Sequence, residues 1–290
     1  MSDDPGGQAA RVAMRSRGLS LHIGVNHVDP GHYRGWEGTL TSCENDADTM
    51  LGIARASGFE ASQLKTAEAT RDGVAQAVRA AAGELAEGDI YLLTYAGHGG
   101  QVRDLDGDEA DGKDDTWCLY DGQLLDDELN VLFAGFRPGV RVLVFSDSCH
   151  SGTMLKGGGQ RPTPPSGVVD DFVHSRQMPR QAAIDTQKAN RSFYAAIQQA
   201  LPRPHPRIHA TVRLLSGCQE NQESFGNATT GRFTAAVKQV FDNGAFRGDY
   251  EAFYSQLVKT VALAMHPQTP NHVVIGAPNR VYDRQVPFTI

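Results

Sequence analysis

A cysteine and a histidine each follow a run of strand-forming residues in this sequence. Cys149 comes directly after the segment RVLVFSDS, and His98 lies among glycines after DIYLLTYA. A thiol becomes a nucleophile when its pKa is lowered or when a nearby base, such as imidazole, takes its proton. Each residue alone is more often a small buried side chain or a turn residue. Together, at the ends of two strands, they predict a Cys/His pair, because the carboxyl ends of parallel strands meet at one edge of a sheet.

Three neighbours of this pair also bear on the chemistry. The glycines beside His98 allow backbone amides to approach a substrate carbonyl closely, as an oxyanion hole requires. His150 is a rival base because it is adjacent to Cys149, but successive residues of an extended chain point to opposite faces, so we expect it to turn away. By the same alternation Asp147 shares a face with Cys149. Its alternative role is to cap the following turn.

Strand-like and helix-like segments alternate along the chain and would hold these residues in place. Ser42 can cap a helix that ends near Ser57, and Thr70 can cap an alanine-rich helix that closes at Gly88. This alternation predicts an α/β fold with a mostly parallel sheet and helices on its faces. Strands are expected in 19–26, 89–96, 141–147, 209–218 and 271–278. Further helices are expected near 126–136, 232–243 and 250–265.

The stretch 155–208 breaks this pattern. It holds seven of the fourteen prolines and a triple glycine, and only RSFYAAIQQAL within it resembles a helix. We interpret the stretch as an exposed, partly disordered connection inside one domain.

The net charge of the chain differs in sign on the two sides of Cys149. Residues 101–130 carry eleven acids and two bases, whereas residues 156–213 carry nine bases and three acids.

Composition narrows the class of protein. The chain has 290 residues, 40% hydrophobic residues and a net charge of −7, which fits a globular protein with a large core. The acidic N-terminus does not read as a secretory signal, and no stretch reaches the roughly 18 apolar residues of a membrane span. The four cysteines are far apart, which is typical of a reducing cytoplasm. We therefore expect a cytoplasmic protein with neither a membrane nor a nucleic acid as partner.

The segments YAGHGGQ and DSCHSGTM resemble the caspase–metacaspase superfamily, and among its members the metacaspases and bacterial orthocaspases most. SCENDADTM and LLSGCQENQES are similar to two further segments of these proteins, so the resemblance covers about residues 19–278. It implies a three-layer αβα sandwich with a mostly parallel sheet of about six strands. It also divides the chain into a tail (1–18), a large-subunit-like part (19–154), the connection (155–208), a small-subunit-like part (209–278) and a C-terminal tail (279–290).

The resemblance also assigns roles to residues. It implies Cys149 as nucleophile, His98 as general acid and base, and the amides of Gly99 and Cys149 as the oxyanion hole. Asp147 and Asp46 would line a pocket for the Arg or Lys of a protein or peptide substrate. For Asp46 the alternative is an acid that favours the first turn of a helix. The usual serine two residues before the histidine is Ala96 here, so its hydroxyl is missing from the pocket.

No cofactor is required for such chemistry, but the acidic stretch raises the question of calcium. Its carboxylates are hard oxygen ligands in a short loop, although an EF-hand would need glycine where Glu109 stands. The resemblance implies a further acid seven residues after the cysteine, and that position is Lys156, so the set is incomplete and calcium binding stays open. The candidate ligands are Asp104, Asp106, Asp108, Asp111, Asp126 and Asp127.

The connection offers basic residues to an Arg/Lys-specific protease. We expect a monomeric zymogen that is cut there by itself or by an upstream protease, with an uncut loop as the alternative. The candidate positions are Arg161, Arg176, Arg180, Lys188, Arg191, Arg203 and Arg207. Two other functions remain open: a hydrolase of the same clan closer to clostripain or separase, and a catalytically silent interaction module.

Overall fold

The structure is a computed structural model that describes residues 16–105, 107, 112–149, 174–219, 222–262 and 268–290. A central sheet of six strands runs through the molecule in the order β11-β9-β7-β3-β1-β2. Five of its strands are parallel to their neighbours, and β11 at one edge is antiparallel to β9. The strands are β1 (Gly18–Gly24), β2 (Glu60–Lys65), β3 (Ile90–Ala96), β7 (Arg141–Asp147), β9 (Thr211–Ser216) and β11 (Asn271–Gly276).

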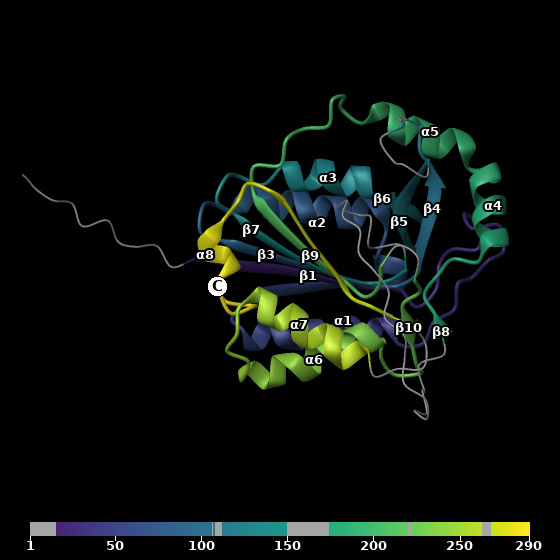
Figure 1. The fold of residues 1–290 in the computed structure, drawn as a ribbon. Coiled ribbons are helices and arrows are strands. Elements are labelled where there is room, and N and C mark those ends of the chain that lie inside the picture. The colour runs from purple at the N-terminus through teal and green to yellow at the C-terminus, as the bar shows by residue number, and fades with distance from the viewer. Residues whose placement is uncertain (1–15, 106, 108–111, 150–173, 220–221, 263–267) are drawn as a thin grey trace, which may run out of the picture.

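Helices cover both faces of this sheet, as Figure 1 shows. On one face α2 (Arg71–Glu84) and α3 (Asp126–Ala134) bury Val78 and Leu132 against the strands. On the other face α1 (Cys43–Ala56), α6 (Arg232–Phe241) and α7 (Tyr250–Val261) enclose a second core around Phe145. The three-layer sandwich and the mostly parallel sheet of six strands are confirmed.

Local sequence accounts for the start of α2 but not for that of α1. The side chain of Thr70 accepts a hydrogen bond from the backbone N–H of Gly73, which caps α2 as predicted. Ser42 precedes α1 but makes no cap with its side chain. Its hydroxyl instead accepts a hydrogen bond from the side chain of Arg176.

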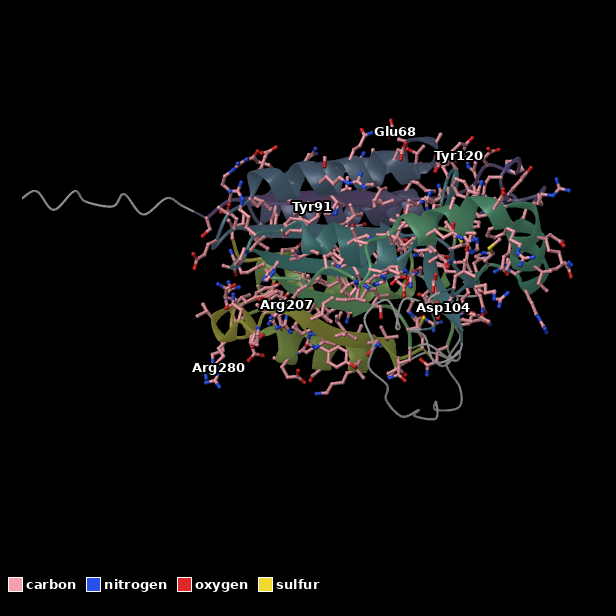
Figure 2. All side chains as sticks on the ribbon, turned by 90° about the horizontal axis from the view of Figure 1, so that it is seen from above. Glu68, Tyr91, Asp104, Tyr120, Arg207 and Arg280 are labelled. Carbon is pink, nitrogen blue, oxygen red and sulfur yellow. The ribbon has the colours of Figure 1, made fainter. Side chains whose placement is uncertain are left out.

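Figure 2 shows Tyr91 in the interior, while Glu68 and Arg280 lie at the surface.

A second, antiparallel sheet follows β3 directly. It consists of β4 (Gly99–Arg103), β5 (Lys113–Leu119) and β6 (Gly122–Leu125) in that order. Trp117 of β5 stacks on Tyr95 of β3, with ring centroids 4.6 Å apart, and its indole N–H donates to Ser146. These contacts fix the small sheet against the end of the central sheet where the Cys/His pair is expected.

The connection is more ordered than expected from 174 onward. It contains β8 (His174–Ser175), α4 (Arg180–Ala189) and α5 (Arg191–Ala200), whereas the sequence indicated one short helix. The short strand β8 pairs with β10 (Phe225–Gly226), and α4 and α5 lie beside the small sheet (Figure 1). Residues 155–173 of the connection lie outside the described residues.

The last residues of the chain are not a detached tail. They contain α8 (Arg280–Asp283), and the side chains of Tyr282 and Phe288 are buried in the second core. Phe288 stacks on Phe145 with ring centroids 5.4 Å apart. Apolar burial therefore holds residues 279–290 on the domain. None of the helices in the described part of the chain has the length and hydrophobicity needed to cross a membrane.

Candidate active site

The ends of β3 and β7 bring His98 and Cys149 to the same edge of the sheet. The two strands are parallel neighbours with Ala96 opposite Asp147, so both chains leave the sheet at the same level. Gly99 then passes against the backbone of Cys149. A Cβ at Gly99 would lie 1.6 Å from the carbonyl oxygen of Cys149, so only glycine permits this approach.

The thiol of Cys149 is buried beside a backbone segment from the other half of the chain. Its Sγ accepts a hydrogen bond from the backbone N–H of Ser224 at 3.1 Å. Cys218 is a second thiol in the same place, and a hydrogen bond with Cys149 together with burial raises the pKa of Cys218. Cys218 therefore stays protonated, and Cys149 is the thiol whose sulfur accepts a backbone N–H.

The imidazole of His98 is buried and neutral at neutral pH. Burial, and secondarily the charge of Arg176, lowers the pKa of His98 from 6.5 to about 4, while the backbone groups of Gly38, Arg176 and Gln177 act in the opposite direction. The ring of Trp36 packs against the imidazole, with centroids 4.9 Å apart. A neutral imidazole can accept a proton from a thiol, so His98 is in the protonation state that a general base requires.

Asp46 and Asp147 lie together in a buried pocket at the same edge of the sheet. Asp46 comes from the first turn of α1, Asp147 is the last residue of β7, and the two are 1% and 2% exposed. The guanidinium of Arg176 fills the space between them. Its Nη2 lies 2.5 Å from Oδ2 of Asp46, and its Nη1 lies 3.3 Å from Oδ1 of Asp147.

Further donors hold the two carboxylates in place. Asp147 accepts hydrogen bonds from the hydroxyl of Ser224 and from the N–H and hydroxyl of Thr234. Asp46 accepts from the hydroxyl of Thr230 and the N–H of Gly231. Each carboxylate therefore keeps partners besides Arg176, as buried charges require.

The charges in this pocket support one another. Burial alone would lower the pKa of Arg176, but the carboxylates of Asp147 and Asp46 outweigh it and raise this pKa. Burial raises the pKa of Asp46, and the charge of Arg176 opposes that rise. A cation in the pocket therefore favours the ionised form of Asp46 against the effect of burial.

The backbone of Arg176 is bound as closely as its side chain. Its carbonyl oxygen accepts from the N–H of Gly99 at 2.9 Å and from the N–H of Cys149 at 3.5 Å. Its own N–H donates to the carbonyl oxygen of Ser224 at 2.9 Å. Beyond it, the N–H of Met178 donates to the carbonyl oxygen of Gly99 at 2.8 Å. The peptide after Arg176 therefore lies between the amides expected for the oxyanion hole, with His98 beside it.

The other predicted residues are distributed differently. Asp104, Asp126 and Asp127 are buried, with Asp126 and Asp127 opening α3 and Asp127 paired with His205. Within the described residues no group of three or more metal-ligating side chains could hold an ion. His150, Asp106, Asp108, Asp111 and Arg161 lie outside the described residues. The exposed processing candidates are Arg180, Lys188, Arg191, Arg203 and Arg207.

Several residues of the site were not identified from the sequence. The hydroxyl of Ser42 accepts from Nη2 of Arg176, which explains why it does not cap α1. Trp36, Ser224, Thr230 and Thr234 also contribute. Ser42 and Ser224 lie in the recognised segments SCENDADTM and LLSGCQENQES, which was the one signal for them, whereas nothing in the local sequence marks Trp36, Thr230 and Thr234.

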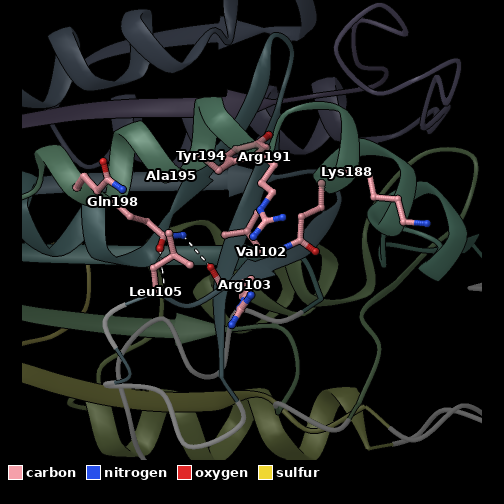
Figure 3. A pocket seen from close by; sticks show the side chains of 10 residues that line it. Val102, Arg103, Leu105, Lys188, Arg191, Tyr194, Ala195 and Gln198 are labelled. Carbon is pink, nitrogen blue, oxygen red and sulfur yellow. Dashed lines mark hydrogen bonds between the residues drawn. The ribbon is translucent and has the colours of Figure 1, made fainter.

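Cavities lie near the site but do not contain the dyad. One of about 840 Å³ follows β4 and α4 and includes Ser175, Gln177 and Met178 in its lining. Another, of about 430 Å³, lies between β4 and α5 (Figure 3). There Gln198 donates to the backbone oxygen of Arg103 and accepts from the N–H of Leu105. The first cavity is open space directly beside residues 175–178, the segment that carries Arg176.

A parallel sheet flanked by helices, with a thiol and an imidazole at neighbouring strand ends, defines a caspase-like protein. The sequence profile of the caspase domain matches residues 17–282. The chain therefore belongs to the caspase-domain family, as the resemblance indicated.

Known proteins agree with this assignment. Metacaspase-1 of Saccharomyces cerevisiae is 28% identical over 264 residues, covering 78% of this chain and 58% of the relative. Metacaspase-1A of Aspergillus fumigatus is 34% identical over 277 residues, covering 83% of this chain and 64% of the relative. The chain thus spans about three fifths of the length of these metacaspases.

Two solved structures are similar in fold. Protein GSU0716 from Geobacter sulfurreducens has a TM-score of 0.82 and 43% identity, covering 94% of this chain and 99% of that chain. Caspase-1 from Spodoptera frugiperda has a TM-score of 0.51 and 15% identity, covering 90% of this chain and 86% of that chain, and its similarity concerns the fold alone.

Proposed function

We propose that this protein is a cysteine endopeptidase that cleaves after Arg, and less efficiently after Lys. The observation that carries the proposal is Arg176, whose side chain fills the pocket of Asp46 and Asp147 while its carbonyl oxygen meets the amides of Gly99 and Cys149. The chain's own arginine thus occupies the place that a substrate residue would take.

The chemistry follows from the groups around that carbonyl. Cys149 gives its proton to His98, and the thiolate attacks the carbonyl carbon of the substrate arginine. The N–H groups of Gly99 and Cys149 stabilise the negative charge that develops on the oxygen. His98 then protonates the leaving amine, and water hydrolyses the thioester. Every catalytic group in these steps is a side chain or a backbone amide of the protein, and the only other reactant is water. The reaction therefore needs no cofactor.

The pocket supports the preference for Arg over Lys. A guanidinium can satisfy two carboxylates through its planar fork, whereas an ammonium is a compact charge with fewer geometric matches. An acidic or apolar side chain would leave Asp46 and Asp147 buried without a cation, which costs free energy. We expect Arg and Lys substrates to exceed Asp substrates by several orders of magnitude in kcat/KM.

The proposal also covers the grouping, location, oligomeric state and activation of the protein. We place the protein with the bacterial metacaspase-like proteases, the orthocaspases, and the 43% identity to a protein from Geobacter sulfurreducens supports the bacterial grouping. We place it in the cytoplasm because its four cysteines are free thiols, which is typical of a reducing compartment. A single chain supplies the dyad, the oxyanion donors and both pocket acids, which supports a monomer. We also propose that the chain is a zymogen processed within 155–208.

Fluorogenic peptides that end in Arg, Lys or Asp test the proposal. We expect hydrolysis in the order Arg, Lys, Asp, and none with the Cys149→Ala protein. The same series with calcium and with a chelator tests whether calcium activates the enzyme, and the proposed chemistry predicts turnover in both. Efficient cleavage after Asp, or no reaction of any peptide with the processed protein, would contradict the function.

A further inference from the structure

We propose that the open edge of strand β4 binds the substrate chain on the C-terminal side of the cleaved arginine, and that it selects protein substrates with acidic residues there. The site is the groove between β4 and the helices α4 and α5. This inference rests on the proposed function and adds a substrate class to it.

Strand β4 forms one edge of the small sheet, with β5 on one side only. On the open side the N–H of Gly99 donates to the oxygen of Arg176 at 2.9 Å, and the oxygen of Gly99 accepts from the N–H of Met178 at 2.8 Å. In a strand of an antiparallel sheet, alternate residues direct their main-chain groups to opposite sides. Gln101 and Arg103 therefore direct theirs to the same open side as Gly99.

The chain itself uses only the first part of this edge. Gln177 lies opposite Gly99 in a parallel bridge, so residues 176–178 run in the same direction as β4. Pro179 comes next and has no N–H to donate, and α4 begins at the following residue. Within the described residues, no hydrogen bond joins the main chain of Gln101 to a group on this side. An extended substrate chain can therefore add to β4 here as a further strand.

A groove follows the open edge. The cavity of about 840 Å³ begins beside Gln177 and is lined by Gln101 and Arg103. The cavity of about 430 Å³ that Figure 3 shows shares Val102, Arg103 and Gln187 with it, so the two form one groove from the active site to α5. The groove gives an extended chain access to the main-chain groups of Gln101.

The side chains along this groove are mostly basic. Among the described residues that line it, Glu223 is the single acid. Asp114 and Asp115 of β5 are 1% and 2% exposed and do not line it. The cations are Lys113, Arg103, Arg180, Lys188 and Arg191. The last four are exposed and form no ion pair within the described residues, so acidic side chains of a bound chain would complement them.

The register at Gly99 predicts which substrate residues reach the groove. A substrate arginine that takes the place of Arg176 puts the next residue opposite Gly99. Two residues further along both chains, the third residue after the arginine lies opposite Gln101, and the fifth lies opposite Arg103. In the hydrogen-bond pattern of Gly99, the oxygen of Gln101 would accept from the N–H of the fourth residue. Acids from the fourth residue onward would meet the cations of the groove.

Internally quenched peptides with a single arginine test the inference on the full chain, once its hydrolysis of a simple Arg peptide has become constant. One peptide carries glutamates at the fourth to seventh residues after the arginine, a second carries them at the same distances before it, and a third carries glutamines after it. Two further peptides have glutamates after the arginine and an N-methyl group on the fourth or on the third residue. The measured quantity is kcat/KM at low and at high salt.

We expect kcat/KM to be about tenfold higher with glutamates after the arginine than with glutamines there or with glutamates before it, and this gain should shrink at high salt. An N-methyl group on the fourth residue should lower kcat/KM by about three- to tenfold, because it removes a hydrogen bond to the oxygen of Gln101. On the third residue, whose N–H points away from β4, it should have little effect.

Two sets of variants test the cations. The double variant Arg103→Gln/Arg191→Gln should remove most of the gain from glutamates after the arginine, because it removes a cation from each side of the groove. Arg79→Gln is the matched control, since Arg79 is an exposed arginine on α2, and it should keep the wild-type ratio of acidic to neutral peptide. The pair of N-methyl peptides needs no protein variant, so it decides the outcome whether or not the double variant folds.

An equal gain from glutamates on either side of the arginine would overturn the inference, because it would show attraction at long range without docking on β4. Equal losses from the two N-methyl groups, or a full gain in a folded double variant, would also overturn it. All of these results leave the proposed function standing, since Arg peptides are still cleaved. Failure of every peptide to react would instead reject the proposed function.

Discussion

The backbone N–H of Gly99 donates a hydrogen bond to the carbonyl oxygen of Arg176 at 2.9 Å. The contact joins the histidine segment to a residue in the middle of the connection. It is a contact between main-chain atoms, so it fixes the position of the peptide bond as well as the direction of the arginine side chain. The Cys/His dyad, the pocket of Asp46 and Asp147, and the segment around Arg176 are therefore in direct contact. Mutations can test the contribution of each one separately.

The dyad gives the first prediction. Cys149→Ala should abolish peptidase activity, and His98→Ala should lower kcat/KM by about a hundredfold to ten-thousandfold, the range typical of a lost general base. His150→Ala is the control and should retain substantial turnover. Peptide hydrolysis and circular dichroism on all three proteins check this. A folded His150→Ala protein as inactive as Cys149→Ala would show that the base was assigned to the wrong histidine.

The pocket acids give the second prediction. Asp46→Asn and Asp147→Ala should each lower kcat/KM for Arg peptides by about a hundredfold or more, because loss of one partner of a buried charge pair costs about 3–5 kcal/mol. Asp48→Asn is a matched control on the same helix, where the carboxylate of Asp48 is 50% exposed and pairs with Lys65. An undiminished preference for Arg in either pocket variant would contradict the assignment.

Gly231 gives the third prediction, which depends on space rather than charge. A Cβ at Gly231 would lie 2.1 Å from Oδ2 of Asp147 and 2.6 Å from Nη2 of Arg176. Gly231→Ala should therefore exclude a guanidinium from the pocket and lower both self-cleavage and Arg-peptide hydrolysis by at least about tenfold, since a misplaced substrate loses its orientation. Gly52→Ala on α1, where a Cβ meets nothing within 4 Å, is the control. Full activity of Gly231→Ala would mean that substrates bind elsewhere.

A buried histidine away from the site gives a prediction about pH and stability. Burial lowers the pKa of His22 from 6.5 to about 3, and its two ring nitrogens contact the hydroxyls of Thr94 and Ser20. Below pH 6.5 the unfolded chain binds a proton at His22 that the folded chain does not, so stability falls as pH falls from 6.5 toward 3. From pH 7 to pH 5 this amounts to about 2 kcal/mol.

Urea unfolding of the Cys149→Ala protein at several pH values measures this effect without self-cleavage. Adding His22→Gln should remove about 2 kcal/mol of the loss between pH 7 and pH 5. Adding His209→Gln at an exposed histidine should change little. Equal pH dependence in both double variants would show that His22 is not the group responsible.

The sequence predicted five of the six strands of the central sheet, because these strands are largely apolar. The strand 141–147 is buried along its whole length, and its polar continuation marked the thiol correctly as a strand-end residue. The small sheet was missed because β4 and β6 are short and because β5 begins in an acidic stretch that resembles a loop. Strand β2 was also missed, since EASQLK at the sheet edge has little apolar content.

The occupant of the pocket could not be found in this way. Arg176 lies in a segment without periodicity, and its partner Asp46 is 130 positions away in the chain. Periodic patterns report on burial of apolar faces, whereas a buried cation is fixed by a few long-range charges and hydroxyls. Composition could only place Arg176 among several basic residues of the connection.

The order of strands in the central sheet has a consequence for a protein cut within the connection 155–208. Strand β7 lies before the connection and its parallel neighbour β9 lies after it, and six residue pairs from Arg141–Thr211 to Ser146–Ser216 join them. Phe145 from the first fragment and Phe233 from the second also share a core. The two fragments are thus one folded unit whose parts are no longer joined covalently.

Unfolding of that unit releases two molecules instead of one, so mass action makes its melting temperature rise with protein concentration. The intact chain, which unfolds into a single molecule, has no such dependence. Dilution should therefore destabilise the cut protein and leave the uncut chain unaffected. Activation by this cut would convert a protein of fixed stability into one whose lifetime depends on how much of it is present.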